Sequence, residues 1–160
     1  MKNNKPSIII YTDGSCSGNP GVGGWGALLV FGENKKEISG FVKNTTNNQM
    51  EIIAAIEALQ VLKTSCTINL YTDSIYLKRG ITSWIQNWKK NNWQKKDRSP
   101  VKNISLWKKL QDKIQEHEVT WHWVRGHANN HGNNIADKLA TEACNHAKNK
   151  YCYNNLNKIL

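Results

Sequence analysis

The sequence predicts an α/β layered domain in which helices pack against a mixed β-sheet. Short stretches rich in β-branched residues come first, a long helical pattern follows, and later strands alternate with helices. A chain of 160 residues is long enough for one domain with a buried core. We expect that domain to span residues 1–148 and to be followed by a polar, frayed tail at 149–160.

The first third of the chain is predicted to form an antiparallel meander. Residues 7–12 favour a strand that stops at Asp13 and Gly14, and two more strands are expected at 27–31 and 37–42. The segment 18–26 is crowded with glycine and contains Pro20, which is typical of a loop.

A helical pattern replaces the strands at residue 47. The helix predicted at 47–63 carries apolar residues on almost all of its faces, so we expect it to be buried against the sheet. The remaining elements are expected in this order: a strand at 67–71, short helices at 75–80 and 81–88, a basic loop, a helix at about 101–115, a strand at 119–124, a loop at 125–132 and a helix at 133–148.

The connection through the buried helix should leave the strands at 7–12 and 67–71 parallel. Asp13 and Asp73 would then follow the carboxyl ends of two strands, about 5 Å apart if the strands are neighbours. Glu51 lies one turn into the buried helix, and Asp137 opens the last helix. These four carboxylates are therefore predicted to converge on one edge of the sheet.

Carboxylates packed together need a cation between them. A ligand set made only of oxygen selects a hard cation, so Mg²⁺ is expected, with Mn²⁺ as a possible substitute. Two such ions clamp the attacking and leaving oxygens of a phosphoryl displacement, and Asp13 is the best candidate to bridge them.

Each carboxylate also has a purely structural interpretation. Asp13 and Gly14 are typical of a hairpin turn, and Glu51 fits a variant capping box with Asn48. Asp73 fits a helix N-cap region, and Asp137 favours a helix N-terminus electrostatically. Convergence of all four is what favours the metal site.

The bulk composition limits the classes of partner. The net charge of +10 favours a polyanion, although the abundance of Asn, Lys and Ile is also compatible with a general residue bias. The four cysteines lack paired zinc-site spacing and are expected to be reduced, with Cys66 and Cys144 in the core. The first apolar run is too short for a signal peptide or membrane span, so a cytoplasmic protein is expected.

Four motifs in series resemble bacterial type 1 ribonuclease H. The resemblance covers nearly the whole chain, up to about Ala147, with matching spacing. The motifs are Tyr-Thr-Asp-Gly-Ser-Cys-Ser-Gly-Asn-Pro-Gly-Val-Gly-Gly-Trp-Gly at 11–26, Thr-Thr-Asn-Asn-Gln-Met-Glu at 45–51, Thr-Asp-Ser at 72–74 and Trp-Val-Arg-Gly-His-Ala at 123–128.

The resemblance implies a three-layer ribonuclease H-like fold with a five-stranded mixed sheet flanked by helices. It implies an endonuclease that cuts the RNA strand of RNA–DNA hybrids without marked sequence preference, leaving 5′-phosphate and 3′-hydroxyl ends. The catalytic and metal-binding residues would be Asp13, Glu51, Asp73 and Asp137, with Mg²⁺ as the cofactor. His127 would assist proton transfer or product release, because a histidine titrates near working pH.

The same resemblance places substrate contacts. Trp84 and Trp88 would belong to a basic handle at about 81–100, although their helical spacing also fits partial burial in the core. Lysines around these tryptophans would attract phosphates without regard to sequence. The other candidate contacts are Cys16, Asn19, Thr46, Asn47, Asn48 and Asn133, of which Thr46 would contact a DNA phosphate. Ordinary turn and cap chemistry is the alternative for the glycine loop and helix start.

Three positions depart from the family pattern. Ile75 stands where relatives usually carry a substrate-contacting Gln, Asn134 replaces a common Glu, and Asn91–Asn92 replaces a basic-glycine pair. They concern substrate affinity and turnover, and none removes an expected metal ligand. We therefore expect a monomeric hybrid-cutting enzyme. The rival interpretations are an inactive hybrid-binding module and a strand-transfer enzyme of related architecture.

Overall fold

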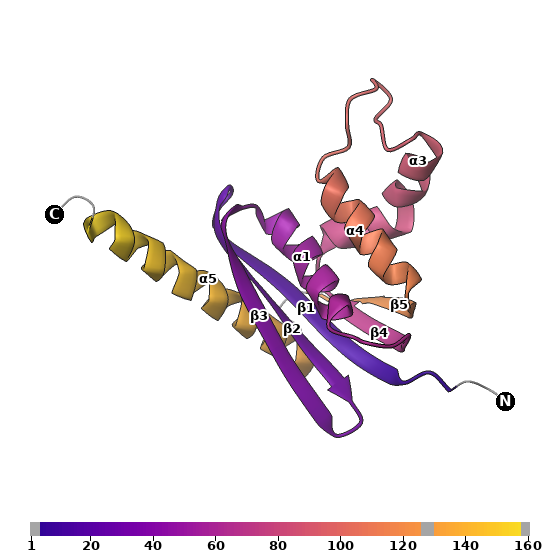
Figure 1. The fold of residues 1–160 in the computed structure, drawn as a ribbon, viewed down its shortest axis with the longest axis horizontal. Helices are drawn as coiled ribbons and strands as arrows, with labels where there is room; N and C mark the ends of the chain where they lie inside the picture. Colours follow the sequence, from indigo (N-terminus) through magenta and orange to yellow (C-terminus); the bar gives the residue numbers. More distant parts are fainter. Residues whose placement is uncertain (1–3, 126–129, 158–160) are drawn as a thin grey trace.

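A five-stranded sheet in the order β3-β2-β1-β4-β5 forms the centre of the molecule (Figure 1). The computed structural model describes residues 4–125 and 130–157, with side chains up to residue 151. The elements are β1 (Ser7–Gly18), β2 (Gly21–Phe31), β3 (Asn34–Thr45), α1 (Asn47–Gln60), β4 (Thr67–Thr72), α2 (Ile75–Arg79), the π-helical turn η1 (Gly80–Trp84), α3 (Ile85–Lys90), α4 (Ile104–Gln115), β5 (Glu118–Trp123) and α5 (His131–Asn157).

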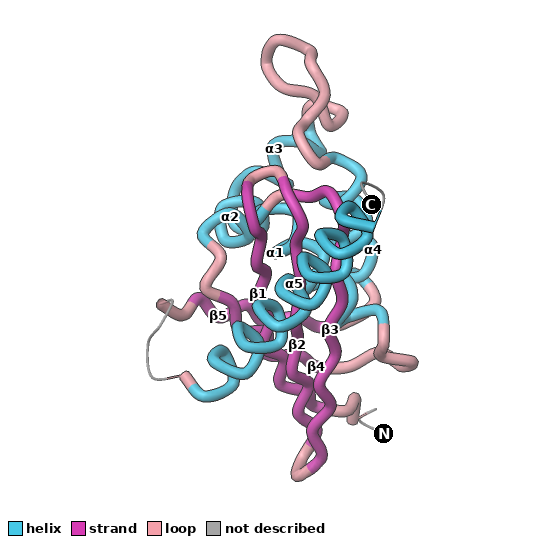
Figure 2. Tube along the Cα trace, turned by 90° about the vertical axis from the view of Figure 1, so that its left-hand side faces the viewer, coloured by secondary structure: helices cyan, strands magenta, loops and turns pink. Residues whose placement is uncertain are grey.

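The sheet is mixed, as the sequence predicted. β1 pairs antiparallel with β2 and parallel with β4, β2 pairs antiparallel with β3, and β4 pairs parallel with β5. Helix α5 crosses one face of the sheet, whereas α1 and α4 pack together on the other side (Figures 1 and 2). The three-layer α/β fold is therefore confirmed. Its core lies between the sheet, α1 and α4, around residues such as Ile10, Ile52, Leu59, Leu70 and Trp107.

The glycine-rich segment is strand rather than the predicted loop. β1 continues to Gly18 and β2 starts at Gly21, so that only Asn19 and Pro20 make the turn. A Cβ atom on Gly24 would lie 2.3 Å from the carbonyl oxygen of Ala140 in α5. Gly24 and Gly26 therefore let α5 approach β2 closely, whereas Gly18, with a φ of 84°, and Gly21 flank the turn.

Two helical regions also differ from the prediction. α2, η1 and α3 follow one another without a break, where two separate short helices were expected. A Cβ atom on Gly80 would lie 2.1 Å from the ring of Trp107, so the π-helical turn starts where that ring packs on the backbone. The last helix continues to Asn157, beyond the expected end at Lys148, and most of the predicted tail is helical.

Within residues 4–125 and 130–157, none of the helices combines the length and the apolar character that a membrane crossing requires.

Candidate active site

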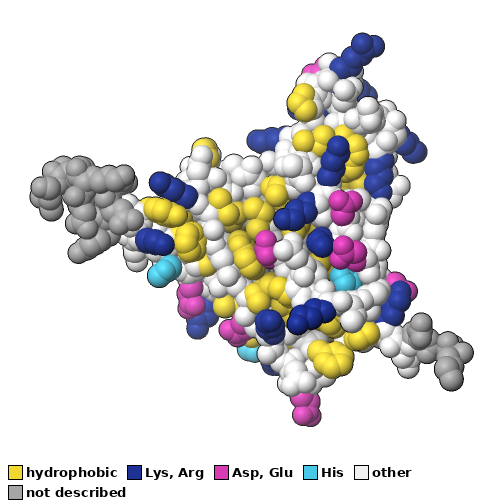
Figure 3. Space-filling model, viewed as in Figure 1, with side chains coloured by type: hydrophobic (Ala, Val, Ile, Leu, Met, Phe, Trp, Pro, Cys, Tyr) yellow, Lys and Arg dark blue, Asp and Glu magenta, His cyan; other side chains and the backbone are white. Residues whose placement is uncertain are grey.

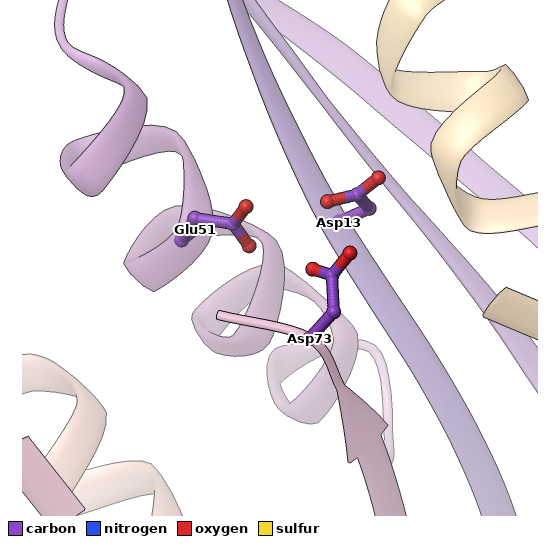
Figure 4. A group of neighbouring side chains, drawn as sticks. All are labelled: Asp13, Glu51 and Asp73. Carbon is purple, nitrogen blue, oxygen red and sulfur yellow. The ribbon is translucent and has the colours of Figure 1, made fainter. Parts of the chain in front are cut away.

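Three carboxylates from separate elements meet at one end of the β1–β4 pair (Figure 4). The parallel register pairs Ile9 with Asn69 and ends with Tyr11 beside Tyr71, so Asp13 and Asp73 each lie two positions further along the chain. Glu51 reaches the same point from α1. One oxygen atom of each carboxylate lies within 4.8 Å of the others. Asp13, Glu51 and Asp73 are called the carboxylate triad below.

The beginning of α1 fixes the position of Glu51. The Thr46 hydroxyl accepts a hydrogen bond from the Gln49 N–H at 3.2 Å, and the Gln49 side chain accepts one from the Thr46 N–H. This capping box satisfies free donors of the first turn and sets where the helix starts. A Cβ atom on Gly14 would lie 2.7 Å from the Glu51 nitrogen, so a glycine next to Asp13 lets the helix approach β1.

Burial and mutual repulsion raise the pKa values of two members of the triad, Asp13 and Glu51. Asp13 is only 6% exposed, and this burial, together with the charge of Asp73 and the neighbouring Asp137, raises its pKa to about 7. Burial and the charges of Asp13 and Asp73 raise the pKa of Glu51 well above its ordinary value. The protein thus keeps buried acids close together at a cost that a cation would offset.

The triad fits a divalent cation. Among the described residues, Glu51 Oε2 is a buried oxygen without a hydrogen-bond partner. Such an atom is costly unless something positive contacts it. The donors are all carboxylate oxygens, which hard cations such as Mg²⁺, Mn²⁺ and Ca²⁺ prefer.

Asp137 borders the same cavity and neighbours Asp13, although it is not a member of the triad. The cavity has a volume of about 440 Å³ and is lined by the triad together with Asn47, Asn48 and Asp137. Asp137 is exposed and lies in the second turn of α5, which starts at His131, two residues before the predicted start. The four predicted carboxylates thus border one cavity, three of them as the triad and the fourth beside Asp13 on the cavity wall. His127 lies outside the described residues.

The predicted substrate contacts at the start of α1 lie around this cavity. Asn47 and Asn48 are exposed on its lining, and the Asn19 Oδ1 atom accepts a hydrogen bond from the Asn47 N–H at 3.2 Å. Cys16 donates its thiol hydrogen bond to the Gly18 carbonyl at 2.7 Å. The β1–β2 turn and the α1 N-terminus are therefore joined. Substrate roles for these residues and Thr46 stay predictions.

The tryptophans of the predicted handle are partly buried. Trp84 and Trp88 pack against the core with ring centroids 5.8 Å apart, and they line a second cavity of about 280 Å³ with Lys95 and Lys102. Both interpretations of the two tryptophans, core and contact surface, are thus compatible with their positions. Asn133 is 2% exposed, so its predicted substrate contact would need a movement of α5.

A polar network that the sequence did not reveal joins α1 to α2 and to the start of α4. The Gln49 amide donates to Asn103 Oδ1 at 3.0 Å, and the Asn103 amide donates to the Tyr76 hydroxyl at 3.1 Å. Trp107 Nε1 donates to the same hydroxyl at 3.3 Å. Asn103 has a φ of 59°, a left-handed conformation that Asn tolerates. A lone Asn before a helix signals a cap, so no pattern in the sequence indicates this link.

The chain is similar to ribonucleases H along almost its entire length. The RNase H family model matches residues 5–145. A ribonuclease H of Rickettsia felis is 59% identical over 135 residues, which cover 84% of this chain and 89% of that protein. A ribonuclease H of Bradyrhizobium diazoefficiens is 56% identical over 137 residues, covering 86% and 89% of the two chains.

Solved structures agree with the sequence comparison. LC9-RNase H1, described as a type 1 RNase H with the type 2 active-site motif, has a TM-score of 0.83 and 30% identity, with 92% of this chain and 76% of that chain covered. LC11-RNase H1, solved in complex with an RNA/DNA hybrid, has a TM-score of 0.66 and 25% identity, with coverage of 88% and 98%. With its sheet order, its carboxylate triad and these likenesses, the chain belongs to the RNase H family.

Proposed function

We propose that this protein is an endonuclease that hydrolyses the RNA strand of RNA–DNA hybrids. The observation that carries the proposal is the carboxylate triad, with Asp13 and Glu51 buried and Asp73 half-buried at the end of the β1–β4 pair, in a chain of the RNase H family. The structurally similar LC11-RNase H1 was solved with an RNA/DNA hybrid bound. The oxygen of a water molecule joins the phosphorus, the bond from phosphorus to the 3′-oxygen breaks, and the products carry a 5′-phosphate and a 3′-hydroxyl.

Mg²⁺ is the proposed cofactor, with Mn²⁺ as a substitute. Asp13, Glu51 and Asp73 would hold it, and Asp137 on the cavity wall would complete the ligand set. A bound divalent ion supplies a more acidic water and stabilises negative charge on the leaving oxygen. Because Asp13 and Glu51 have raised pKa values, these side chains must release protons when the cation binds.

The chain's own residues orient the substrate over this site. Asn47 and Asn48 line the cavity and would reach 2′-hydroxyl groups, which alone distinguish RNA from DNA. Thr46 and Asn19, where the β1–β2 turn meets the α1 N-terminus, would position the two strands of the hybrid. Asn133 and Cys16 would make further contacts with the substrate. His127, in the segment before α5, would assist proton transfer or product release.

The handle supplies attraction without sequence preference. Lys95 and Lys102 stand beside Trp84 and Trp88, so cations and an aromatic surface lie together. Lysine contacts to phosphates are independent of base sequence and weaken with salt. The single catalytic domain of residues 1–148 with its handle at about 81–100 would act as a monomer in the cytoplasm.

The test is cleavage of an end-labelled hybrid by the purified protein in Mg²⁺. Internal cuts confined to the RNA strand are expected, and both EDTA and Asp13→Asn should abolish them. Single-stranded RNA and duplex DNA serve as substrate controls, and Asp112→Asn, an exposed acid on α4, serves as the matched variant. Tight binding of the hybrid without cutting would overturn the proposal and leave a hybrid-binding module.

A further inference from the structure

A cluster of aromatic rings and lysines lies on the molecule away from the handle. Phe41 of β3 contacts Tyr151 and His146 of α5, with ring centroids 6.2 and 6.4 Å apart. The Lys43 ammonium lies 5.0 Å from the Tyr151 ring centroid, and that of Lys150 lies 5.7 Å from the Phe41 ring centroid. These five residues are called the β3–α5 patch. Hydrophobic, basic and histidine side chains gather there in Figure 3, beside the grey C-terminal atoms.

Packing of the core does not account for the patch. Phe41 is 37% exposed and is one of the few large apolar residues on the surface, whereas the core cluster includes neither Phe41 nor Tyr151. Among the described residues, neither Lys43 nor Lys150 forms an ion pair with a carboxylate. Uncompensated cations held over aromatic rings favour an anionic partner that also has a flat surface.

The position of the patch relates it to the active site. The last five residues of β3, from Phe41 to Thr45, lead directly into the α1 N-cap at Thr46. Five residues of strand span about 16 Å. This distance equals the length of about five nucleotides along one nucleic-acid strand. In Figure 1 the α1 helix stands between the handle region around α3 and the C-terminal half of α5, so patch and handle flank the site on opposite sides.

We propose that the β3–α5 patch binds a single-stranded continuation of the substrate where it leaves the active site on the side away from the handle. The inference rests on the proposed function, because it places the nucleic acid across the triad. Unpaired bases expose the faces that stack on aromatic side chains, while lysines follow the phosphates. A duplex keeps those faces inside its own stack, so the rings favour the single strand.

The test measures binding of three hybrids to the non-cleaving Asp13→Asn protein. One hybrid is blunt, and the others carry a single-stranded extension at one or the other end, longer than the distance from triad to patch. An extension at one end should tighten binding by about fivefold or more. Combining Phe41→Leu, Lys43→Gln and Lys150→Gln should remove that gain and leave binding of the blunt hybrid little changed.

The controls separate stacking from general charge. Lys36→Gln combined with Lys63→Gln removes the same charge from exposed positions outside the patch and should keep the gain. Phe41→Leu alone keeps most of the volume and should lose part of the gain, and circular dichroism melting checks the fold of each variant. No gain from either extension, an equal gain in the patch variant, or an equal loss in the lysine control would overturn the proposal. Cleavage of the blunt hybrid by the wild type tests the proposed function separately.

Discussion

Asp13 and Asp73 lie beside each other because each follows, by two residues, the last matched pair of two parallel strands. Tyr11 and Tyr71 form that pair, and their rings are stacked with centroids 5.0 Å apart. Side chains two residues apart on a strand point to the same face, so the register that stacks the tyrosines also brings the two acids together. The site is therefore a direct consequence of backbone pairing in the middle of the sheet.

The raised pKa of Asp13 predicts how pH affects stability without metal. Its pKa is about 7 in the folded state, against an ordinary value of 3.8, so the folded protein binds the extra proton. The free energy of unfolding should therefore fall as pH rises from about 4 to 7 and stay low above 7. Asp13→Asn removes this charge and should raise the free energy of unfolding at pH 8 by about 2–4 kcal/mol, with little effect at pH 4.

Denaturant unfolding in EDTA at pH 4 and pH 8 measures this difference. The comparison variant is Asp97→Asn, because hydrogen bonds from Ser99 lower the pKa of exposed Asp97, the opposite direction. An Asp13→Asn protein that is less stable than wild type at pH 8 would contradict the prediction.

Addition of Mg²⁺ should stabilise the wild-type protein against heat. At a concentration about a hundredfold above the dissociation constant, binding contributes about 2.7 kcal/mol, or a rise in melting temperature of about 5–10 °C. Glu51→Gln should reduce the rise strongly, whereas Asp112→Asn, an exposed acid-to-amide change on α4, should keep it. An equal rise in all three proteins would show that the ion binds elsewhere.

Gln49 is predicted to affect substrate binding more than the chemical step. Its side chain caps α1 next to Thr46 and donates to Asn103 Oδ1, so Gln49→Leu breaks the link from α1 to the start of α4, next to Lys102. We expect KM to rise about threefold to tenfold with kcat nearly unchanged. Steady-state cleavage kinetics measures the split, with Gln60→Leu at the exposed end of α1 as the control. A fall in kcat at constant KM would place Gln49 in the chemistry instead.

Lys95 and Lys102 should determine part of the salt dependence of hybrid binding. Each phosphate contact that is lost reduces the slope of log affinity against log salt by about 0.9 for a B-form duplex. The combined Lys95→Gln and Lys102→Gln variant should therefore show a clearly shallower slope in a salt titration. Lys36→Gln with Lys63→Gln should leave the slope unchanged. Equal slopes of log affinity against log salt for all proteins would exclude phosphate contacts of Lys95 and Lys102.

Periodicity and chain order were enough to predict the layers of the fold. The β-branched run before Asp13 and the almost wholly apolar helix around Glu51 identified the central strand and the buried helix, and the parallel pairing followed from their connection. The prediction of a loop at 18–26 was wrong, because composition does not distinguish a glycine in a turn from one that lets a helix pack closely against a strand. Gly24 and Gly26 face α5, and only the folded arrangement shows that contact.

The site was predicted in part for a related reason. Asp13, Glu51 and Asp73 follow from strand ends and one helical turn, which are local features, and the structure brings them together. The approach of Asp137 to Asp13 depends on how α5 lies across the sheet, which no local pattern in the sequence indicates. The Gln49 to Asn103 hydrogen bond joins residues 54 positions apart, and no local pattern indicates such a pairing.

Because the register of β1 with β4 assembles the active site, the specific activity of a sample depends on how many of its molecules have folded with that register. A slip of one residue between these strands would turn every side chain of the moved strand to the opposite face. Asp73 would then no longer meet Asp13, and the buried carboxylates Asp13 and Glu51 would lose their third neighbour. A misregistered molecule can be compact and helical and still lack the centre for cleavage. Specific activity per molecule therefore measures the fraction of chains whose central pairing is correct, which spectroscopy of secondary structure does not resolve.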